Sequence, residues 1–400
     1  MKTNNWRTPV LILVCGSIIL TLAMGVRHTA GLFLQPMTLA HGWSRETFSF
    51  AIALQNLVWG LASPFAGAIA DRHGAGRTIA AAAALYLVGL MLMAHADTSL
   101  ALDLSGGLLI GLGLSGTTFA VILGVIGRHT TPQKRSLALG VASAGGSFGQ
   151  FAVLPIGQTL IGAFGWQSAL MLLACGVGLI VPLAWTMADG HRPSAGPGQS
   201  VAQALREAGG ERSFHYLFWS YFVCGFQTAF IMLHLPSFLV DSGFSANVGM
   251  TAVALIGLFN IFGSFLFGWG GGRCSKKNLL ALIYGLRGVA IVVFLSVPLS
   301  SVSAWVFAAA MGLLWLGTVP LTNGLVAQIF GLRYMSMLTG VVFLGHQLGS
   351  FLGAWLGGRI YDETGSYLVA WAVAVGLSVL ATILSWPIDE RPLAREGARA

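Results

Sequence analysis

Charged residues are scarce in this chain: Asp, Glu, Lys and Arg together make up only 8% of its 400 residues. A soluble domain typically carries about 25% charged residues. Hydrophobic residues, by contrast, make up 56% of the chain. The shortage of charge argues against an ordinary soluble protein and predicts a chain that lies mostly in a lipid bilayer.

Cysteines and catalytic motifs are equally scarce. The four cysteines, Cys15, Cys175, Cys224 and Cys274, are spaced too far apart to indicate a disulfide framework or a metal site. The phosphate-binding P-loop is missing, so we do not expect ATP as the energy source. GLGLSG (111–116) resembles a nucleotide-binding turn only faintly, because no strand precedes it. The sequence therefore predicts no enzyme, no cofactor and no metal site.

Long apolar runs are what the sequence has in abundance. A helical span needs about 20 predominantly apolar residues. Twelve runs approach or exceed this length, and they do not alternate polar and apolar residues as transmembrane barrels do. They lie near 8–33, 46–70, 77–95, 99–127, 135–163, 166–187, 214–240, 246–270, 278–297, 301–329, 335–360 and 366–387. We expect an all-α membrane protein with twelve transmembrane helices.

The distribution of basic residues predicts the orientation, because cytoplasmic loops are enriched in Lys and Arg. With a cytoplasmic N-terminus, 17 of the 21 basic residues fall on the inner side and only Arg45 and Arg359 fall in outer loops. The seventeen are Lys2, Arg7, Arg72, Arg77, Arg128, Lys134, Arg135, Arg192, Arg206, Arg212, Arg273, Lys276, Lys277, Arg333, Arg391, Arg395 and Arg399. We expect a multi-pass protein of a bacterial-type inner membrane with both termini in the cytoplasm. The net positive charge follows from this asymmetry and does not indicate nucleic acid.

A polar stretch divides the chain into two parts that repeat. LFLQPMTLAHGWS (32–44) aligns with LHLPSFLVDSGFS (233–245) at an offset of 201, which also places GAIADRHGAGR (67–77) on GWGGGRCSKKN (268–278). Gly140, Gly145, Gly149 and Gly165 fall on Gly340, Gly345, Gly349 and Gly365 at an offset of 200. We expect a six-helix bundle at 1–187, a cytoplasmic linker at 188–213, a second six-helix bundle at 214–387 and a cytoplasmic tail at 388–400. Since each copy has an even number of spans, the two repeats are parallel.

These features resemble the major facilitator superfamily. GAIADRHGAGR is similar to that family's G-x-x-x-D-R-x-G-x-[RK] loop between the second and third spans. The resemblance implies two bundles that rock about a substrate near the midplane. We expect Asp71, Arg72 and Arg77 to form a charge latch that closes when the inner faces meet. The second copy has Gly272 where Asp71 would be, so we expect the latch in the first half only.

A narrower resemblance is to the monocarboxylate porter and oxalate–formate antiporter branch. KRSLALGVASAGGSFGQ (134–150) is similar to that branch's entry to the fifth span, and LGHQLGSFLGAWLGGRIYDETGSY (344–367) resembles its eleventh span. Two features depart from the branch. Its acidic, tryptophan-bearing signature in the first span is absent, and the eighth span (246–270) lacks the Asp–Arg pair that its members use for proton and anion.

An arginine inside the first span is the main candidate for substrate binding. Arg27 stands beside His28 in GVRHTAGLFLQPM (25–37), and all thirteen acids lie in loops or at span edges, Asp103 being the deepest. A charge at this depth costs at least about 3 kcal/mol, so it usually faces a cavity and serves a function. An anionic substrate is the expected partner, because the planar guanidinium binds carboxylates bidentately. The alternative is that Arg27 snorkels to the outer surface. A second arginine, Arg287, caps carbonyls, packs against the eighth helix or contacts substrate.

Histidine is the side chain most easily protonated near neutral pH. We therefore take His28, His234, His346 and the carboxyl of Asp103 as candidates for proton coupling. The alternative for each histidine is a neutral ring bonded to a helix carbonyl.

Other polar and aromatic side chains fall on spans that line the cavity in this family. Many of them are equally consistent with helix-to-helix hydrogen bonds worth about 1 kcal/mol each. Tryptophans offer a stacking face for a flat ligand, although they are also common at membrane interfaces. The set is Gln55, Asn56, Trp59, Thr118, Gln150, Trp219, Gln227, His234, Asn260, Trp315, Asn323, His346 and Gln347.

The sequence as a whole predicts a monomeric secondary transporter whose partners are a small-molecule substrate and the lipid bilayer. The favoured substrate is a small organic anion of the monocarboxylate type, moved by proton symport or anion exchange. Alternatives are a polar heteroaromatic such as a flavin-type vitamin, and efflux of hydrophobic drugs or metabolites. A transporter-like sensor is a further alternative, but the loops and tail leave little room for an output segment.

Overall fold

The computed structural model describes residues 7–43, 45–188 and 200–393. Lys2, Arg192, Arg395 and Arg399, most of the expected linker and the end of the expected tail lie outside the described residues. Within these ranges every regular element is a helix, which confirms the all-α expectation.

The first repeat contains the helices up to residue 183. They are α1 (Pro9–His28), α2 (Ala30–His41), α3 (Arg45–His73), α4 (Ala75–Met93), α5 (Ser99–Leu102), the π-helical η1 (Asp103–Leu109), α6 (Ile110–Thr117), α7 (Phe119–His129), α8 (Pro132–Gly178) and α9 (Ile180–Leu183). The short α10 (Val201–Gly210) follows in the linker region. The second repeat contains α11 (Arg212–Asp241), α12 (Ala246–Gly270), α13 (Lys276–Ser296), α14 (Ser301–Leu313), α15 (Thr318–Phe330), α16 (Met335–Thr364) and α17 (Leu368–Ser385).

Twelve of the resulting helical spans are long and apolar enough to cross a membrane, as the sequence predicts. The expected run at 278–297, for example, corresponds to the span Lys276–Ser296. The fifth and sixth spans join in the long α8, whose backbone turns at Gly165 with φ 77°. Glycine adopts this left-handed conformation without the steric penalty of a side chain.

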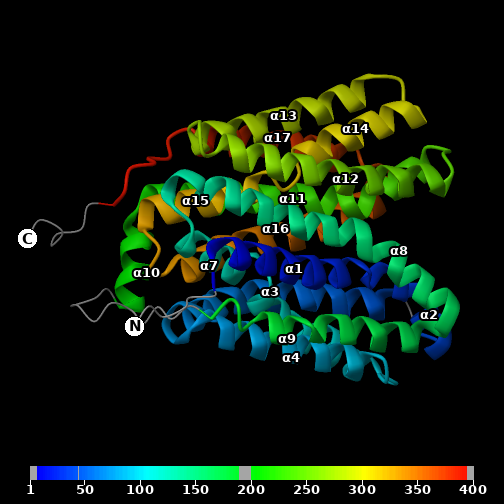
Figure 1. The fold of residues 1–400 in the computed structure, drawn as a ribbon. Helices are drawn as coiled ribbons and strands as arrows, with labels where there is room; N and C mark the ends of the chain where they lie inside the picture. Colours follow the sequence, from blue (N-terminus) through cyan, green and yellow to red (C-terminus); the bar gives the residue numbers. More distant parts are fainter. Residues whose placement is uncertain (1–6, 44, 189–199, 394–400) are drawn as a thin grey trace, which may run out of the picture.

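The helices run side by side, and the first and last described residues lie at the same end of the molecule (Figure 1). In this view the first repeat occupies the lower part, the second repeat occupies the upper part, and α8 and α16 lie between. We call the end that carries the chain termini, α10 and the starts of α8 and α16 the terminal face. The end that carries the connection from α2 to α3 is the opposite face.

The fourth and tenth spans are both interrupted near their middles. In the fourth span Thr118, with φ −114° and ψ −161°, separates α6 from α7. In the tenth span α14 ends at Leu313 and α15 begins at Thr318. Since Thr118 and Thr318 are 200 residues apart, the interruptions follow the offset at which the sequence repeats.

The two repeats meet along two seams that run from the helix middles to the terminal face. The first seam joins α3 to α16: a Cβ added at Gly340 would lie 2.7 Å from the Ser63 carbonyl oxygen. The second seam joins α8 to α12: a Cβ added at Gly140 would lie 2.7 Å from the Gly268 Cα. At both seams the backbones approach so closely that larger side chains do not fit.

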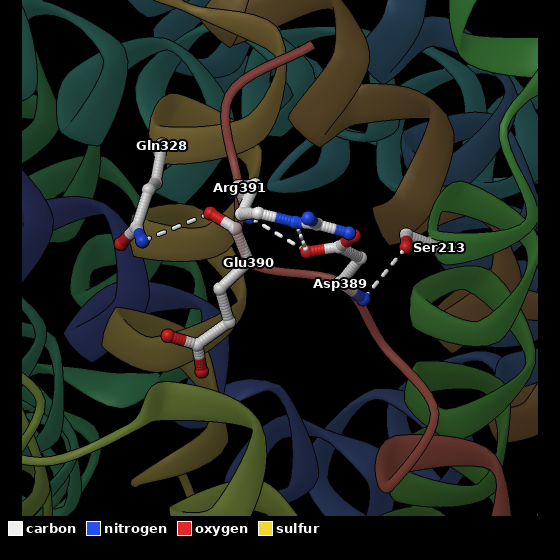
Figure 2. A network of polar contacts seen from close by, with 5 residues as sticks. All are labelled: Ser213, Gln328, Asp389, Glu390 and Arg391. Atoms are coloured by element: carbon white, nitrogen blue, oxygen red, sulfur yellow. Dashed lines mark hydrogen bonds and ion pairs between the residues drawn. The ribbon is translucent and has the colours of Figure 1, made fainter.

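A short C-terminal segment, the tail strap (residues 389–393), crosses the terminal face of the second repeat (Figure 2). The Asp389 N–H donates to the Ser213 hydroxyl at 2.9 Å, and the Gln328 side-chain amide donates to the Glu390 carbonyl at 2.9 Å. The strap therefore connects the beginning of α11 to the end of α15.

Glu390 also reaches the beginning of α13. One of its carboxylate oxygens accepts hydrogen bonds from the Ser275 hydroxyl at 2.8 Å and from the Lys277 N–H at 2.7 Å. A carboxylate at this place satisfies a free N–H of the helix and complements the positive end of the helix dipole. The strap thus ties three helices of the second repeat together.

Candidate functional site

Arg27 lies in the last turn of α1, where its guanidinium is held by α3. Its Nη2 donates a hydrogen bond to the Asn56 side-chain oxygen, and its Cζ lies 4.9 Å from the centroid of the Trp59 ring. Its Nε is buried and has no hydrogen-bond partner among the described residues, and no described carboxylate pairs with it. A guanidinium with neutral partners and an unused donor is suited to bind an anion.

Trp59 supports Arg27 and also touches the second repeat. Its indole N–H donates to the Thr118 hydroxyl at 3.0 Å, at the interruption of the fourth span. Its ring centroid lies 4.9 Å from that of Phe343 on α16. Arg27 therefore sits next to the first seam, where the repeats meet.

The second repeat contributes Gln347 and His346 at the same level of the first seam. The Gln347 side-chain amide donates to the Asn56 carbonyl oxygen at 3.2 Å. Its oxygen lies 3.1 Å from Nδ1 of His346. The imidazole is 4.9 Å from the Tyr221 ring and stacks on Phe343 at 5.5 Å, measured between ring centroids. The structure thus brings Arg27, Asn56, Trp59, Thr118, His346 and Gln347 into one cluster.

A second polar contact joins the repeats across the other seam. The Asn260 side-chain amide donates to the Ser147 hydroxyl at 2.9 Å, and its oxygen accepts from the Leu316 N–H at 2.9 Å. Leu316 lies in the interruption of the tenth span. Gln150 lies on this seam as well, since a Cβ added at Gly257 would be 3.7 Å from its Cδ.

Three other expected amides hydrogen-bond within their own repeat. Gln55, Gln227 and Asn323 are almost completely buried, and each donates to a main-chain carbonyl. Their acceptors are Gly106 at 2.7 Å, Ala374 at 3.0 Å and Val319 at 2.9 Å, respectively. Their roles in substrate binding stay predictions.

Two of the three expected histidines bond helix carbonyls. Nδ1 of His28 lies 2.6 Å from the Met24 oxygen, and Nε2 of His234 lies 2.9 Å from the Ala354 oxygen. Asp103 begins η1, and its Oδ1 is buried without a hydrogen-bond partner in the described part of the chain. Among the described residues no group of three or more His, Cys, Asp or Glu is placed to hold a metal ion.

Arg287 caps the interrupted tenth span. It is fully buried, and its Nε and Nη2 donate to the Leu314 carbonyl oxygen at 3.0 and 2.7 Å. Nη2 also donates to the Trp315 carbonyl oxygen, and Nη1 donates to Gln227 at 3.3 Å. Of the expected roles for Arg287, this geometry matches the capping of carbonyls. Trp315 is buried beside it, and its contact with substrate stays a prediction.

At the terminal face Asp71 pairs with a different arginine from the two expected in the latch. Asp71 forms an ion pair with Arg128 at 2.6 Å, and its other oxygen accepts from the Met337 N–H at 2.9 Å. Arg72 and Arg77 are exposed. Arg128 ends the fourth span, 57 residues after Asp71, so the local loop motif does not identify it. Because Met337 begins α16, the Asp71 carboxylate bonds across the two repeats.

A small cavity of about 20 Å³ lies inside the first repeat, next to Arg27, Gln55 and Tyr86. A water needs at least roughly 10–15 Å³ of such space, so this cavity holds about one water. It is too small for an organic anion.

Sequence reasoning missed several side chains of the cluster and its seams. Tyr221, Phe343 and Ser147 complete the surroundings of His346, Trp59 and Asn260. Aromatic and serine residues are common in membrane spans, so only their placement distinguishes them. Ser147 lies 200 residues before Gln347, so the two occupy equivalent positions in the two repeats. This equivalence was the one signal in the sequence that pointed to Ser147.

A comparison with protein-family profiles identifies the family. Residues 13–353 and 217–400 match the sequence profile described as Major Facilitator Superfamily. The chain belongs to the major facilitator superfamily. It is therefore a multi-pass membrane transporter for small molecules and not an enzyme.

Relatives of this major facilitator chain include transporters from bacteria and mammals. The uncharacterized MFS-type transporter YcxA of Bacillus subtilis is 24% identical over 389 residues, which cover 92% of this chain and 93% of YcxA. Monocarboxylate transporter 11 of Homo sapiens is 28% identical, with 89% of this chain and 78% of the relative covered. Monocarboxylate transporter 13 of Rattus norvegicus is 26% identical, with coverages of 90% and 86%.

Solved structures confirm the major facilitator fold. The proton:xylose symporter XylE, bound to 6-bromo-6-deoxy-D-glucose, superposes with a TM-score of 0.79 at 13% identity, covering 96% of this chain and 97% of XylE. The transporter FucP in the outward conformation superposes with a TM-score of 0.76 at 14% identity, covering 93% and 97%. At these identities the likeness concerns the fold alone.

Proposed function

We propose that this major facilitator chain is a secondary active transporter of a small organic anion of the monocarboxylate class. The observation that carries the proposal is Arg27: a guanidinium inside a span, with neutral partners and a buried Nε that no described residue satisfies. A carboxylate substrate would supply the missing acceptor and the counter-charge. Asn56 and Trp59 would hold the guanidinium in place for it.

Relatives support this substrate class. Monocarboxylate transporters 11 and 13 align with most of this chain. The eighth span of this chain contains Asn260 and lacks the Asp–Arg pair of the monocarboxylate branch. This departure is consistent with an anion-binding residue on a different helix. Arg27 in the first span would then supply the positive charge.

Orientation and conformation follow from the seams and from the basic loops. We propose that the terminal face is cytoplasmic in a bacterial-type inner membrane, because the positive-inside rule places both termini there. With both seams closed toward this face, the structure would represent the state open to the outside. FucP, one of the matching structures, is in an outward conformation. The chain would work as a monomer, with substrate and lipid and no nucleic acid as partners, built from bundles at 1–187 and 214–387.

Proton symport is the proposed energy source. XylE is a proton symporter, and FucP is described as a fucose:proton symporter. His28, His234, His346 and Asp103 are the candidate carriers in this chain. Anion exchange is the alternative, and transport that ignores an imposed proton gradient would favour it.

The contacts of the tryptophans disfavour the flavin alternative. The Trp59 ring makes a cation–π contact with the Arg27 guanidinium and packs against the Phe343 ring. Trp219 is 51% exposed and packs against Phe218 and Phe222 on its own helix. Neither ring offers an open face toward the seam.

The test is a thermal-shift panel on the purified protein, followed by uptake into proteoliposomes. The panel compares short monocarboxylates, a flavin and hydrophobic cations. We expect a monocarboxylate to raise the Tm of the wild type and to leave Arg27→Lys unchanged, because lysine lacks the planar fork. Uptake of that acid should fall about tenfold or more in the variant, equivalent to roughly 1.4 kcal/mol.

Arg72→Lys is the matched control, because Arg72 is exposed and lies outside the cluster. It should keep both the thermal shift and the uptake of the wild type. A flavin or a hydrophobic cation that stabilises the protein while every monocarboxylate fails would replace the proposal by the corresponding alternative. Wild-type uptake by Arg27→Lys would remove Arg27 from the site.

A further inference from the structure

We propose that Gln347 is a positioning residue that links protonation of His346 to closure of the terminal face. This inference requires that the terminal face alternates between a closed and an open state. The role of His346 in proton coupling rests on the proposed function. Its evidence is a continuous set of contacts: His346 to Gln347, Gln347 to Asn56, and Asn56 to Arg27. These contacts cross from the second repeat to the first and end at the candidate anion site.

The position of Gln347 makes it suitable for this role. It is 4% exposed and lies near the middle of α16, where the first seam begins. From there the seam continues to the terminal face, where Asp71 accepts from the Met337 N–H. A Cβ added at Gly60 would lie 2.7 Å from the Gln347 Cβ, so α3 and α16 are in close contact at this level. Gln347 is therefore close to the point about which the repeats would separate.

The Gln347 amide can respond to the protonation state of His346, because it both donates and accepts hydrogen bonds. A protonated imidazole donates through both nitrogens, so Nδ1 requires an acceptor. The Gln347 oxygen, at 3.1 Å, is a closer acceptor than the Ser350 hydroxyl at 3.4 Å. When Gln347 presents this oxygen to His346, its NH₂ group points to the Asn56 carbonyl. A neutral imidazole with an unprotonated Nδ1 instead accepts from the amide. The turned amide would face the Asn56 carbonyl with its own oxygen, and the bond across the seam would be lost.

Few other titratable groups face His346. On α11, Tyr221 lies 4.9 Å from it between ring centroids, and the Cys224 thiol lies beside it. On α3 the titratable residues are at the helix ends, and on α7 they are Arg128 and His129 at the terminal face. The sequences of α15 and α17 contain none. Arg27 is separated from His346 by Gln347 and Asn56 on one side and by Phe343 and Trp59 on the other. Of the three histidines in spans, His346 is thus the one that lies in this cluster.

The other two histidines lack such a link. His28 and His234 each hydrogen-bond a main-chain carbonyl in their own repeat. Protonation of either ring changes no described contact between the repeats. The geometry therefore selects His346 from the candidate carriers.

The experiment measures closure of the terminal face without substrate, so that it is independent of the proposed substrate class. Spin labels are attached to the native Cys274, which is exposed, and to a cysteine introduced by His73→Cys on the other repeat. Cys175→Ser removes the other exposed cysteine. Double electron–electron resonance in nanodiscs then gives the fraction of molecules with the short, closed distance between about pH 5 and 9, the range over which histidine titrates.

We expect the closed fraction of the wild type to rise as the pH falls. In Gln347→Met and in His346→Gln the closed fraction should be nearly independent of pH. Asn260→Val is the matched control, because Asn260 also bonds across a seam but contacts no titratable side chain. It should lower the closed fraction at every pH and keep the wild-type midpoint.

Three results would overturn the link. They are a wild-type closed fraction that does not change with pH, a wild-type midpoint retained in Gln347→Met, and a pH response that survives in His346→Gln. Because no substrate is present, the failure of a monocarboxylate to bind leaves this test intact. Conversely, a positive result here does not depend on the identity of the anion.

Discussion

Asn56 holds the Arg27 guanidinium with a neutral oxygen, and this neutrality is important for an anion site. Asn56→Asp would place a carboxylate on Arg27 that competes with the substrate carboxylate. We expect the KM for the transported acid to rise about tenfold or more, roughly 1.4 kcal/mol, while the Tm is unchanged or higher. Steady-state uptake and thermal unfolding measure the two effects. Asn56→Ser, which stays neutral, should change KM less, and an unaltered KM in Asn56→Asp would contradict the site.

Arg287 supports the interrupted tenth span by satisfying the Leu314 and Trp315 carbonyl oxygens. Arg287→Leu would leave these buried acceptors unpaired, at about 1–3 kcal/mol for each group. We expect the Tm to fall by roughly 4–8 °C for a loss of about 2 kcal/mol. Arg72→Leu, at an exposed arginine, should be close to neutral. Equal Tm values for the two variants would show that Arg287 is not a structural cap.

The sequence identifies chemically unusual residues better than their partners. Arg27 was recognisable because a charge inside an apolar run is rare, and its distance from all acids indicated an anion. Asn56, its partner 29 residues away, and Arg128, the partner of Asp71, depend on how helices pack. The histidines show the same limit. Two of the three histidines in spans, His28 and His234, hydrogen-bond main-chain carbonyls, whereas His346 contacts the side-chain amide of Gln347. The sequence pattern does not distinguish these environments.

Among the elements, α8 shows how glycine permits the repeats to meet. Gly140 lies against Gly268 of α12, whereas a side chain at Gly162 of the same helix would meet nothing within 4 Å. We expect Gly140→Val to prevent full closure of the terminal face and to slow turnover several-fold. Gly162→Val is the control and should behave as the wild type. Maximal uptake rate and the spin-label distance are the measurements, and an unchanged closed fraction in Gly140→Val would contradict the tight seam.

The tail strap offers a pair of neighbouring acids with different roles. Glu390 accepts two hydrogen bonds at the beginning of α13, whereas Asp389 pairs with Arg391 at the surface. We expect Glu390→Ala to destabilise the second repeat by about 1 kcal/mol, the typical value of a helix cap. Asp389→Asn should be nearly neutral, since exposed ion pairs contribute little. Thermal unfolding of both variants decides the point, and equal effects would show that the cap is unimportant.

Hydrogen bonds from Arg391 lower the pKa of Asp389 to about 2. A carboxyl whose pKa is lowered in the folded state contributes stability above its ordinary pKa of about 3.9, and this contribution is lost as the pH falls toward 2. The pair is therefore charged throughout the range from about pH 5 to 9 that histidine titration requires. A pH response of the terminal face in that range does not come from this pair.

Span positions were predictable because length and apolar composition determine them. The interruptions were not, since a run such as 301–329 stays apolar across the residues between α14 and α15. What interrupts the helix is a partner from another span, Arg287, which satisfies the freed carbonyls. The cap formed by Glu390 likewise joins residues 113 apart and has no local pattern.

At the scale of the whole molecule, the two seams close by different means. The first seam contains the Asp71–Arg128 ion pair and the bond from the Met337 N–H, whereas the second relies on glycine contacts and Asn260. The sequence shows that Gly272 stands in the second repeat where Asp71 stands in the first. The close packing of the neighbouring Gly271 against Ser136, which takes the place of an ion pair at the second seam, is evident only from the structure.

We expect Asp71 to control the balance between states and not the choice of substrate, because its contacts lie at the terminal face. Asp71→Asn should weaken the closed terminal face, so we expect the maximal uptake rate to fall several-fold while KM changes less than about twofold. Arg72→Gln, at the neighbouring exposed residue, should leave both values near the wild type. A large rise in KM with an unchanged maximal rate would argue against a latch.

The tail strap also has a consequence for biosynthesis. The Lys277 N–H at the beginning of α13 is capped by a residue that lies 113 positions further along the chain. At a synthesis rate of roughly 5–20 residues per second, α13 waits about 6 to 23 s for its cap. During this interval the ninth span is already available for membrane insertion, but its end at the terminal face lacks this cap. We expect a chain truncated before Glu390 to keep its twelve spans but to be selectively sensitive to protease at residues 271–277.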